Sequence, residues 1–279
     1  MPELPEVETV RRGLIPRMVG HRIVKLRQHR QDLRVPLPQR FAARVEGRTV
    51  RAIDRRAKYL LVRLDDGHTL VVHLGMSGRM TLHDAASAAA HPFDRHDHVV
   101  MDMDDGWQVR FNDARRFGLM LLVPDESVAT HKLFRSLGPE PLEASFDGAA
   151  LAARLKGKRT AIKAALLDQT TLVGIGNIYA CEALYLAGLS PRRKADTVRK
   201  EKAERLAAAL KQVLLRSIDD GGSTLRDHVQ PGGELGYFQT RFNVYDRAGT
   251  PCPTPGCGRP IKRLVQGGRS TFYCAHCQR

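Results

Sequence analysis

The chain has 279 residues, enough to bury a sizeable core and to form more than one domain. Its 45 basic residues outnumber its 30 acidic residues, and the net charge of +15 favours nucleic acid over a membrane surface as a partner. No apolar run approaches membrane-spanning length, and the acidic N-terminus is unlike a signal peptide. We therefore expect a cytoplasmic protein without structural disulfides. Charge alone does not show that the partner is nucleic acid, because a protein can be basic simply as a soluble protein.

The first eight residues are Met-Pro-Glu-Leu-Pro-Glu-Val-Glu. Initiator methionine is usually removed before proline, which would leave Pro2 with a free secondary amine. Such an amine can attack a carbon atom and form an iminium, and the neighbouring Glu3 offers a carboxyl group for proton transfer. The same stretch is also typical of an ordinary helix start, since Pro5 suits a first turn and Glu6 favours the helix dipole.

Short segments with a strand-like pattern follow this first helix. Two pairs of these segments flank Asp-Asp-Gly turns, which are hairpin signals. The strand candidates are residues 21–30, 59–64, 69–74, 98–103, 107–111 and 118–123. The alanine- and serine-rich residues 85–90 are expected to form a surface loop. The pattern predicts an antiparallel sandwich or barrel with one leading helix.

Polar and glycine-rich motifs lie among the predicted strands. Arg-Arg-Ala-Lys, ending at Lys58, precedes the first hairpin, where a basic cluster is most often a solvated strand edge but can also bind phosphate. Met76 lies between Gly75 and Gly78, which suggests that a tight turn presents its side chain. Taken alone, a methionine here is more often a core residue. The string Asp-Ala-Arg-Arg-Phe-Gly contains Arg115 and Phe117.

The second half of the chain has a helical period. A linker rich in proline and glycine is predicted at residues 136–142. The helix candidates after it are residues 149–156, 160–167, 178–186 and 197–218. Glycines precede Asn177 at the start of the third candidate. They suit either a tight helix–helix turn or the approach of a phosphate to backbone amides.

Four of the five cysteines lie near the C-terminus. Cys252 and Cys257 enclose four residues, and Cys274 and Cys277 enclose two. Paired thiolates separated by a hairpin-sized insert suit tetrahedral zinc, and four protein ligands leave no open position. We therefore expect one structural Zn²⁺ per chain. Cys181, in an apolar helix, is predicted to be a small core residue.

Together these motifs resemble those of the bacterial formamidopyrimidine-DNA glycosylases. The strings that carry the resemblance are PELPEVETVRRGL, RRAKYLL, DARRFG, GIGNIYACEALY and the C-terminal cysteines, whose first pair is more commonly spaced C-x-x-C in the family. These matching strings are distributed over nearly the whole chain. The resemblance implies an α+β multidomain protein: an N-terminal β-sandwich with a leading helix (residues 1–135), a helix–two-turn–helix domain (136–230) and a zinc-finger hairpin (231–279).

The resemblance also implies a bifunctional DNA glycosylase and abasic-site lyase that removes oxidised purines, such as 8-oxoguanine and formamidopyrimidines. Pro2 is then the nucleophile that forms a Schiff base, followed by β- and δ-elimination. Glu3 and Lys58 are the proton-transfer groups, and Glu6 supports the site. Arg269 matches an arginine that binds phosphate and assists the second elimination.

By the same resemblance, a further set of residues contacts DNA. Met76 fills the gap left by the extruded nucleotide, Arg115 faces the orphaned base, and Phe117 is an aromatic wedge. The phosphate contacts are His96, Arg159 and Asn177. Arg159 stands where the family often has lysine, so a guanidinium fork replaces a point charge. Residues 221–227 resemble the family's mobile loop over the flipped base.

Two alternatives stay open from the sequence. An endonuclease VIII-like enzyme shares the proline and the zinc but prefers oxidised pyrimidines, whereas PELPEVE and ARRFG favour the purine branch. A non-enzymatic zinc-ribbon DNA-binding protein is the second alternative, and the N-terminal proline argues against it. We expect a monomer that binds damaged double-stranded DNA in the cytoplasm, associated with the nucleoid, with no membrane partner and no small-molecule cofactor.

Overall fold

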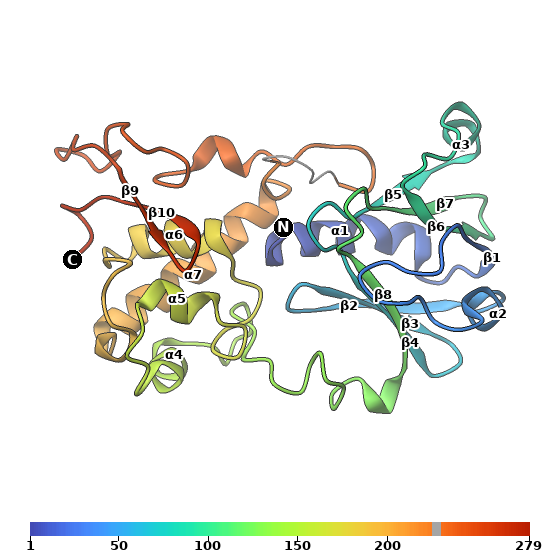
Figure 1. Ribbon diagram of the computed structural model, residues 1–279, viewed down its shortest axis with the longest axis horizontal. Helices are drawn as coiled ribbons and strands as arrows, with labels where there is room; N and C mark the ends of the chain where they lie inside the picture. The colour runs from blue at the N-terminus through green and yellow to red at the C-terminus, as the bar shows by residue number, and fades with distance from the viewer. Residues whose placement is uncertain (225–229) are drawn as a thin grey trace. The chain divides into compact units, whose positions relative to one another are not determined.

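The computed structural model describes residues 1–224 and 230–279, and the chain forms two compact units (Figure 1). The first unit comprises Met1–Arg135 with Asp220–Tyr237, and the second comprises Ser136–Asp219 with Phe238–Arg279. Among the described residues, no helix has the length and apolar character needed to cross a membrane. The division into three domains at residues 135 and 230 stays a prediction.

The first unit is built on two four-stranded antiparallel sheets, ordered β2-β3-β4-β8 and β1-β6-β7-β5. The strands are β1 (Ile23–Gln28), β2 (Val50–Arg56), β3 (Tyr59–Leu64), β4 (His68–His73), β5 (Arg79–His83), β6 (Asp97–Met103), β7 (Gln108–Asn112) and β8 (Leu119–Pro124). The helices are α1 (Leu4–Met18), α2 (Phe41–Val45) and α3 (Ala85–Ala90), with a 3₁₀ turn η1 (Asp125–Ser127). The predicted sandwich with a leading helix is confirmed.

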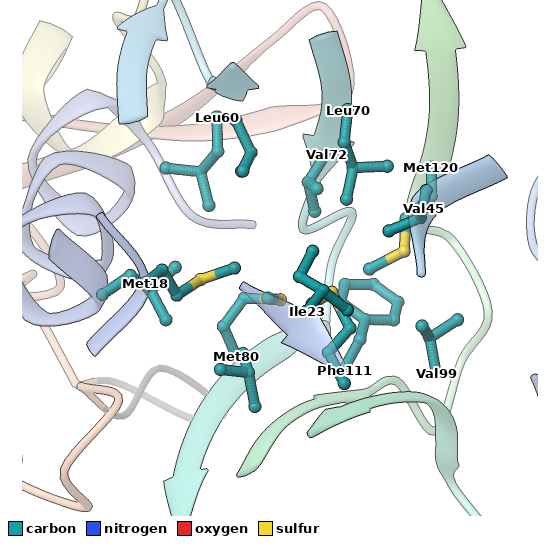
Figure 2. Packing of buried hydrophobic residues seen from close by; sticks show 14 of the residues in the cluster. Met18, Ile23, Val45, Leu60, Leu70, Val72, Met80, Val99, Phe111 and Met120 are labelled. Carbon is teal, nitrogen blue, oxygen red and sulfur yellow. The ribbon is translucent and has the colours of Figure 1, made fainter. Parts of the chain in front are cut away.

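One apolar core lies between the sheets and α1 (Figure 2). Helix α1 contributes Val7, Val10, Leu14 and Met18, which are three or four positions apart and therefore share one face. Phe111 from β7 is fully buried among them and the strand residues. Each such side chain contributes about 1.5–3 kcal/mol of burial free energy, so the core fixes α1 against the sandwich.

The two predicted hairpins are confirmed, but other local predictions were wrong. Residues 85–90 form α3 rather than a loop, because Asp84 caps the helix by accepting a hydrogen bond from the Ser87 amide at 2.7 Å. The basic cluster directly precedes the β3–β4 hairpin, as predicted, but it also ends an unpredicted strand, since Arg56 ends β2 and Ala57 turns the chain into β3 with φ +54°. Strand β2 was missed because a register shift after Val50 breaks its alternation.

The second unit contains the four predicted helices, α4 (Gly148–Leu155), α5 (Ile162–Leu167), α6 (Asn177–Leu186) and α7 (Glu201–Asp219). It also contains two 3₁₀ turns, η2 (Ala195–Thr197) and η3 (Phe238–Arg241), and the hairpin of β9 (Lys262–Gln266) and β10 (Arg269–Tyr273). Helix α7 packs against α4 and α6, and α6 packs against β10. The predicted helical region and zinc-finger hairpin are confirmed.

Candidate functional site

The first turn of α1 holds the start of the chain in a fixed conformation. The Glu3 amide donates to Glu6 Oε2 at 2.8 Å, and the Glu6 amide donates to the Glu3 side chain, which together form a capping box. Both carboxyl groups belong to residues that are less than 5% exposed, at 4% and 3%. The other oxygen of Glu6 accepts from the Ser223 amide at 2.9 Å. Glu6 thus joins the N-terminal turn to a distant segment of the same unit.

Pro2 lies directly ahead of this turn and is half-buried. In the structure Met1 precedes it and is exposed, so the Pro2 nitrogen is part of a peptide bond. Removal of Met1 would convert that nitrogen into a secondary amine, already held beside the buried carboxyl groups of the capping box.

Helix α1 is tied to β2 by charged groups. Glu8 Oε2 lies 3.2 Å from Arg55 Nε, and Arg11 donates to the Ile53 carbonyl oxygen at 3.1 Å. Burial raises the pKa of Glu8, but hydrogen bonds from Arg11 and Arg12 outweigh it and leave that pKa below its usual value. These contacts fix the first helix against the strand that leads to the Lys58 turn.

Lys58 lies in the turn between β2 and β3 and is only 6% exposed. Its charge acts on His73 in β4, whose pKa falls to about 4 because of burial first and the charges of Lys58 and Arg34 second. His73 is therefore neutral near pH 7, and its Nδ1 accepts a hydrogen bond from the Gly75 amide at 3.0 Å. A neutral histidine beside Lys58 adds no second positive charge to this region.

Met76, Arg115 and Phe117 lie on two neighbouring loops of the first unit. Phe117 is 47% exposed, and the Arg115 guanidinium lies 4.8 Å from the centre of its ring. The loops meet at Gly75, where an added Cβ would lie 2.3 Å from the Phe117 carbonyl carbon. Gly75 also has φ +65°, so both space and conformation require glycine here. The structure thus brings together the three residues predicted to occupy the DNA stack.

A buried carboxylate connects these two loops. Asp113 is 0% exposed, and its Oδ1 accepts from Ser77 Oγ at 2.6 Å. Its Oδ2 accepts from the Gly118 amide at 2.8 Å. Ser77 Oγ in turn accepts from the Arg115 amide at 3.1 Å. His96, another predicted DNA contact, accepts from the Asp113 amide through its carbonyl oxygen at 3.0 Å.

In the second unit, Asn177 and Lys163 hold the hairpin that carries Arg269. Asn177 Nδ2 donates to the Ser270 carbonyl oxygen at 2.9 Å, and Lys163 Nζ donates to the same oxygen at 3.1 Å. Lys163 is 0% exposed and also donates to Thr271 Oγ1 at 2.6 Å. Arg269 itself is exposed at the start of β10. Arg159 is exposed in the segment between α4 and α5.

The sequence did not single out Glu182, which lies in α6 and is 0% exposed. Its carboxylate accepts from the amides of Asn243, Val244 and Tyr245 at 2.8–2.9 Å. It also accepts from the Asn243 side chain at 2.9 Å. The Tyr245 hydroxyl lies 3.4 Å from Asn177 Nδ2, so Glu182 supports the same hairpin contacts. The sequence signal that could have identified Glu182 is that it is the only acidic residue in the apolar stretch that forms α6.

The four C-terminal cysteines form a compact cluster. Their sulfur atoms lie within 4.8 Å of one another, with Cys252–Cys277 at 3.9 Å and Cys257–Cys274 at 3.7 Å. A zinc–sulfur bond of about 2.3 Å places tetrahedral ligand atoms about 3.8 Å apart, so the cluster fits zinc. The cysteines hold one structural zinc ion at the base of the β9–β10 hairpin.

The predicted site residues divide between the two units. The first unit contains Pro2, Glu3, Glu6, Lys58, Met76, His96, Arg115 and Phe117, and the second contains Arg159, Asn177, Arg269 and the cysteines. Of the predicted loop at residues 221–227, residues 225–227 lie outside the described part of the chain. Cys181 is buried in the core beside the zinc-finger residues, as predicted.

A β-sandwich led by a proline-containing turn, followed by a helix–two-turn–helix and a zinc hairpin, defines the class of zinc-finger DNA glycosylases. Three family models match in that order: the formamidopyrimidine-DNA glycosylase N-terminal domain at residues 1–120, its H2TH domain at 137–229, and the zinc finger found in FPG and IleRS at 249–279. The chain belongs to the formamidopyrimidine-DNA glycosylase family.

Individual relatives match over the full length. A formamidopyrimidine-DNA glycosylase from Beijerinckia indica is 55% identical over 288 residues, covering 100% of both chains. The crystal structure of the Fpg protein from Thermus thermophilus is 42% identical with a TM-score of 0.86, covering 99% of this chain and 98% of that one. A Lactococcus lactis Fpg mutant bound to Fapy-dG-containing DNA is 33% identical with a TM-score of 0.88, covering 99% of each chain.

Proposed function

We propose that the protein is a bifunctional DNA glycosylase and abasic-site lyase that excises oxidised purines from double-stranded DNA in base excision repair. The observation that carries this proposal is membership of the family over the whole chain. The N-terminal turn, in which Pro2 precedes two buried carboxyl groups, supports the chemistry. The net charge of +15 suits a nucleic-acid substrate.

Base removal begins with the amine of Pro2, after Met1 has been cleaved. Its nitrogen attacks C1′ of the damaged nucleotide, the glycosidic bond breaks, and the bond's electron pair leaves with the base, which takes up a proton. Opening of the sugar ring, with protonation of its oxygen, gives an iminium between Pro2 and C1′. Glu3 and Lys58 transfer the protons, and Glu6 positions Glu3 through the hydrogen bond to its amide.

Strand cleavage follows from the same covalent intermediate. The iminium acidifies C2′, and loss of a proton there breaks the C3′–O bond. Loss of a further proton at C4′ then breaks the C5′–O bond, so the strand is cut on both sides of the removed nucleoside. Water hydrolyses the remaining imine and regenerates the amine. Arg269 binds a phosphate oxygen and assists the second elimination.

The wedge residues hold the duplex open while the damaged nucleotide lies in the site. Met76 fills the vacated position, Phe117 separates base pairs, and Arg115 donates hydrogen bonds to the orphaned base. Their loops are cross-linked through Asp113 and Ser77, which supports a concerted action of these side chains. His96, Arg159 and Asn177 are assigned to phosphate binding.

Zinc has a structural role in this proposal. Four cysteine ligands leave no position for substrate, so the ion stabilises the hairpin that carries Arg269. Asn177 and Lys163 hold the other side of that hairpin through Ser270. We further propose that the enzyme works in the cytoplasm on nucleoid DNA, since the proposed substrate is a lesion of chromosomal DNA.

The substrate class is tested by comparing single-turnover excision from two duplexes of identical sequence. One carries 8-oxoguanine and the other carries an oxidised pyrimidine. We expect the purine lesion to be removed at least about tenfold faster, a difference of about 1.4 kcal/mol in activation free energy. The reverse preference would favour the endonuclease VIII-like alternative. Binding without excision of either lesion would favour a non-enzymatic zinc-ribbon protein.

A further inference from the structure

A strongly basic, open pocket of about 470 Å³ lies in the second unit, and none of the residues assigned above lines it. It is lined by Ser190, Arg192, Arg193, Lys194, Thr197 and Arg279. This set, here called the Arg192 pocket, contains four cationic side chains and no aspartate or glutamate. Three of its cations follow one another directly in the sequence, after the end of α6.

The pocket has cations available for a ligand. Within residues 1–224 and 230–279, none of the four cationic side chains forms a salt bridge with a carboxylate side chain. Arg193 is held in place, because its Nε donates to an α-carboxylate oxygen of Arg279, the last residue, at 3.3 Å and its Nη1 lies 3.5 Å from Thr197 Oγ1. This carboxylate offsets one of the four positive charges. Arg192 and Lys194 are exposed. Guanidinium groups bind phosphate through paired donors, so this geometry favours a phosphate over a simple halide ion.

The pocket is connected to the hairpin that carries Arg269. Gln266 Nε2 donates to the Pro191 carbonyl oxygen at 3.2 Å, next to Arg192 in the sequence. Gln266 is also the partner of Arg269 across the β9–β10 pair. Asn177 lies at the other end of α6, which spans roughly 15 Å at 1.5 Å per residue. The pocket borders the segment of Arg159, because the Ile162 amide donates to the Arg193 carbonyl oxygen at 2.7 Å and the Ala195 amide donates to the Thr160 carbonyl oxygen at 2.9 Å. None of its lining residues is an assigned phosphate contact, so it would extend those contacts along the second unit.

We propose that the Arg192 pocket binds a nucleic-acid phosphate outside the segment that carries the lesion. This inference rests on the proposed function, because it assumes that DNA is the polyanion. The phosphate belongs either to a flanking region of the same duplex or to a second duplex. In either case the pocket adds sequence-independent affinity and leaves the chemistry at the lesion unchanged.

The test uses the double variant Arg192→Ala with Lys194→Ala, which removes two exposed cations and preserves the hydrogen bonds of Arg193. The matched control is Arg205→Ala with Arg216→Ala. It removes the same charge from two exposed positions on α7. Thermal unfolding and zinc content verify that both variants are folded.

Affinity for abasic-analogue duplexes of about 12 and about 40 base pairs is measured against salt, the shorter spanning roughly 40 Å at 3.4 Å per base pair. If the pocket binds a flanking phosphate, the log–log slope of the pocket variant is shallower than that of the control by about 0.9 per lost contact. If the pocket binds a second duplex, the pocket variant saturated with the short duplex captures labelled undamaged DNA less well than the control variant does.

A pocket variant that matches the control in both measurements would overturn the proposal. Excision of 8-oxoguanine from a lesion duplex of the same short length distinguishes this failure from failure of the proposed function. Wild-type enzyme that excises no lesion refutes the proposed function, whereas normal excision with unaltered slopes and capture refutes only the pocket.

Discussion

At the scale of single residues, the charge of Lys58, in the turn between β2 and β3, affects the stability of the sandwich through His73. His73 lies in β4 with its ring 4.8 Å from that of Tyr59, and its Nδ1 accepts from the Gly75 amide at 3.0 Å. Protonation of Nδ1 would abolish this hydrogen bond and place a buried charge near Lys58 and Arg34. Both effects act in the direction that lowers the pKa from 6.5 to about 4.

This shift predicts an acid-dependent loss of stability. Because the folded pKa lies below the unfolded value, the contribution of His73 is fully present above pH 6.5 and is lost as the pH falls toward 4. It amounts to about 3 kcal/mol. The substitution His73→Gln retains an acceptor oxygen but does not titrate, so its unfolding free energy should fall less over this range. Urea unfolding at intervals between pH 7 and 4 measures the difference, and parallel curves would rule the histidine out.

At the scale of elements, one loop carries Met76 and a second loop carries Arg115 and Phe117; we call them the wedge loops. They act together because Ser77 and Asp113 join them. The substitution Ser77→Ala removes a donor from a buried carboxylate and an acceptor from the Arg115 amide, and should destabilise the fold by about 1–3 kcal/mol. It should also blunt discrimination between cytosine and adenine opposite 8-oxoguanine, as Arg115→Ala should.

Cleavage of a preformed abasic site separates positioning from general damage to the fold. Ser77→Ala should alter this activity less than it alters opposite-base discrimination. Ser87→Ala, in the same unit, is the control and should leave both unchanged. Equal losses of both activities in Ser77→Ala would mean that the hydroxyl serves stability alone.

The zinc hairpin makes a separate prediction at this scale. Cys274→Ser should lower zinc content from about one ion per chain to nearly none, because the fully buried Cys274 is one of four ligands. DNA binding should weaken with it, since Arg269 loses a fixed support. His276→Ala is the matched control, an exposed residue between the last two cysteines, and should retain zinc. Elemental analysis that finds no metal in the unaltered protein would contradict the assignment.

The elements that the sequence predicted well are those fixed by local chemistry. The Asp-Asp-Gly turn before His68 sets the β3–β4 hairpin, and cysteine spacing identifies the zinc site without any long-range information. By contrast, the Ser77–Asp113 bond joins positions 36 apart, and no local pattern encodes it. The burial of Glu182 likewise depends on a segment 61 residues later. The short helix α3 was missed because residues 85–90 have no apolar periodicity, and the helix depends on a cap from Asp84.

At the scale of the whole molecule, the proposed nucleophile and the proposed DNA contacts lie on different elements. The N-terminal turn and the wedge loops belong to the first unit, whereas the zinc hairpin and the Arg192 pocket belong to the second. A change confined to the first turn should therefore abolish catalysis while zinc binding and most of the DNA affinity persist. This separation makes the identity of the nucleophile directly measurable.

The decisive measurement is borohydride trapping on an 8-oxoguanine duplex, followed by mass spectrometry of the cross-linked peptide. The mature protein is compared with a form that retains Met1 or carries one added residue. In that form the Pro2 nitrogen is an amide, whose lone pair is delocalised and cannot form an iminium. We expect a cross-link at Pro2 in the mature protein. In the extended form we expect no cross-link and neither excision nor strand cleavage, with zinc content unchanged. A cross-link at Lys58 or another lysine, or full activity in the extended form, would contradict the proposed mechanism.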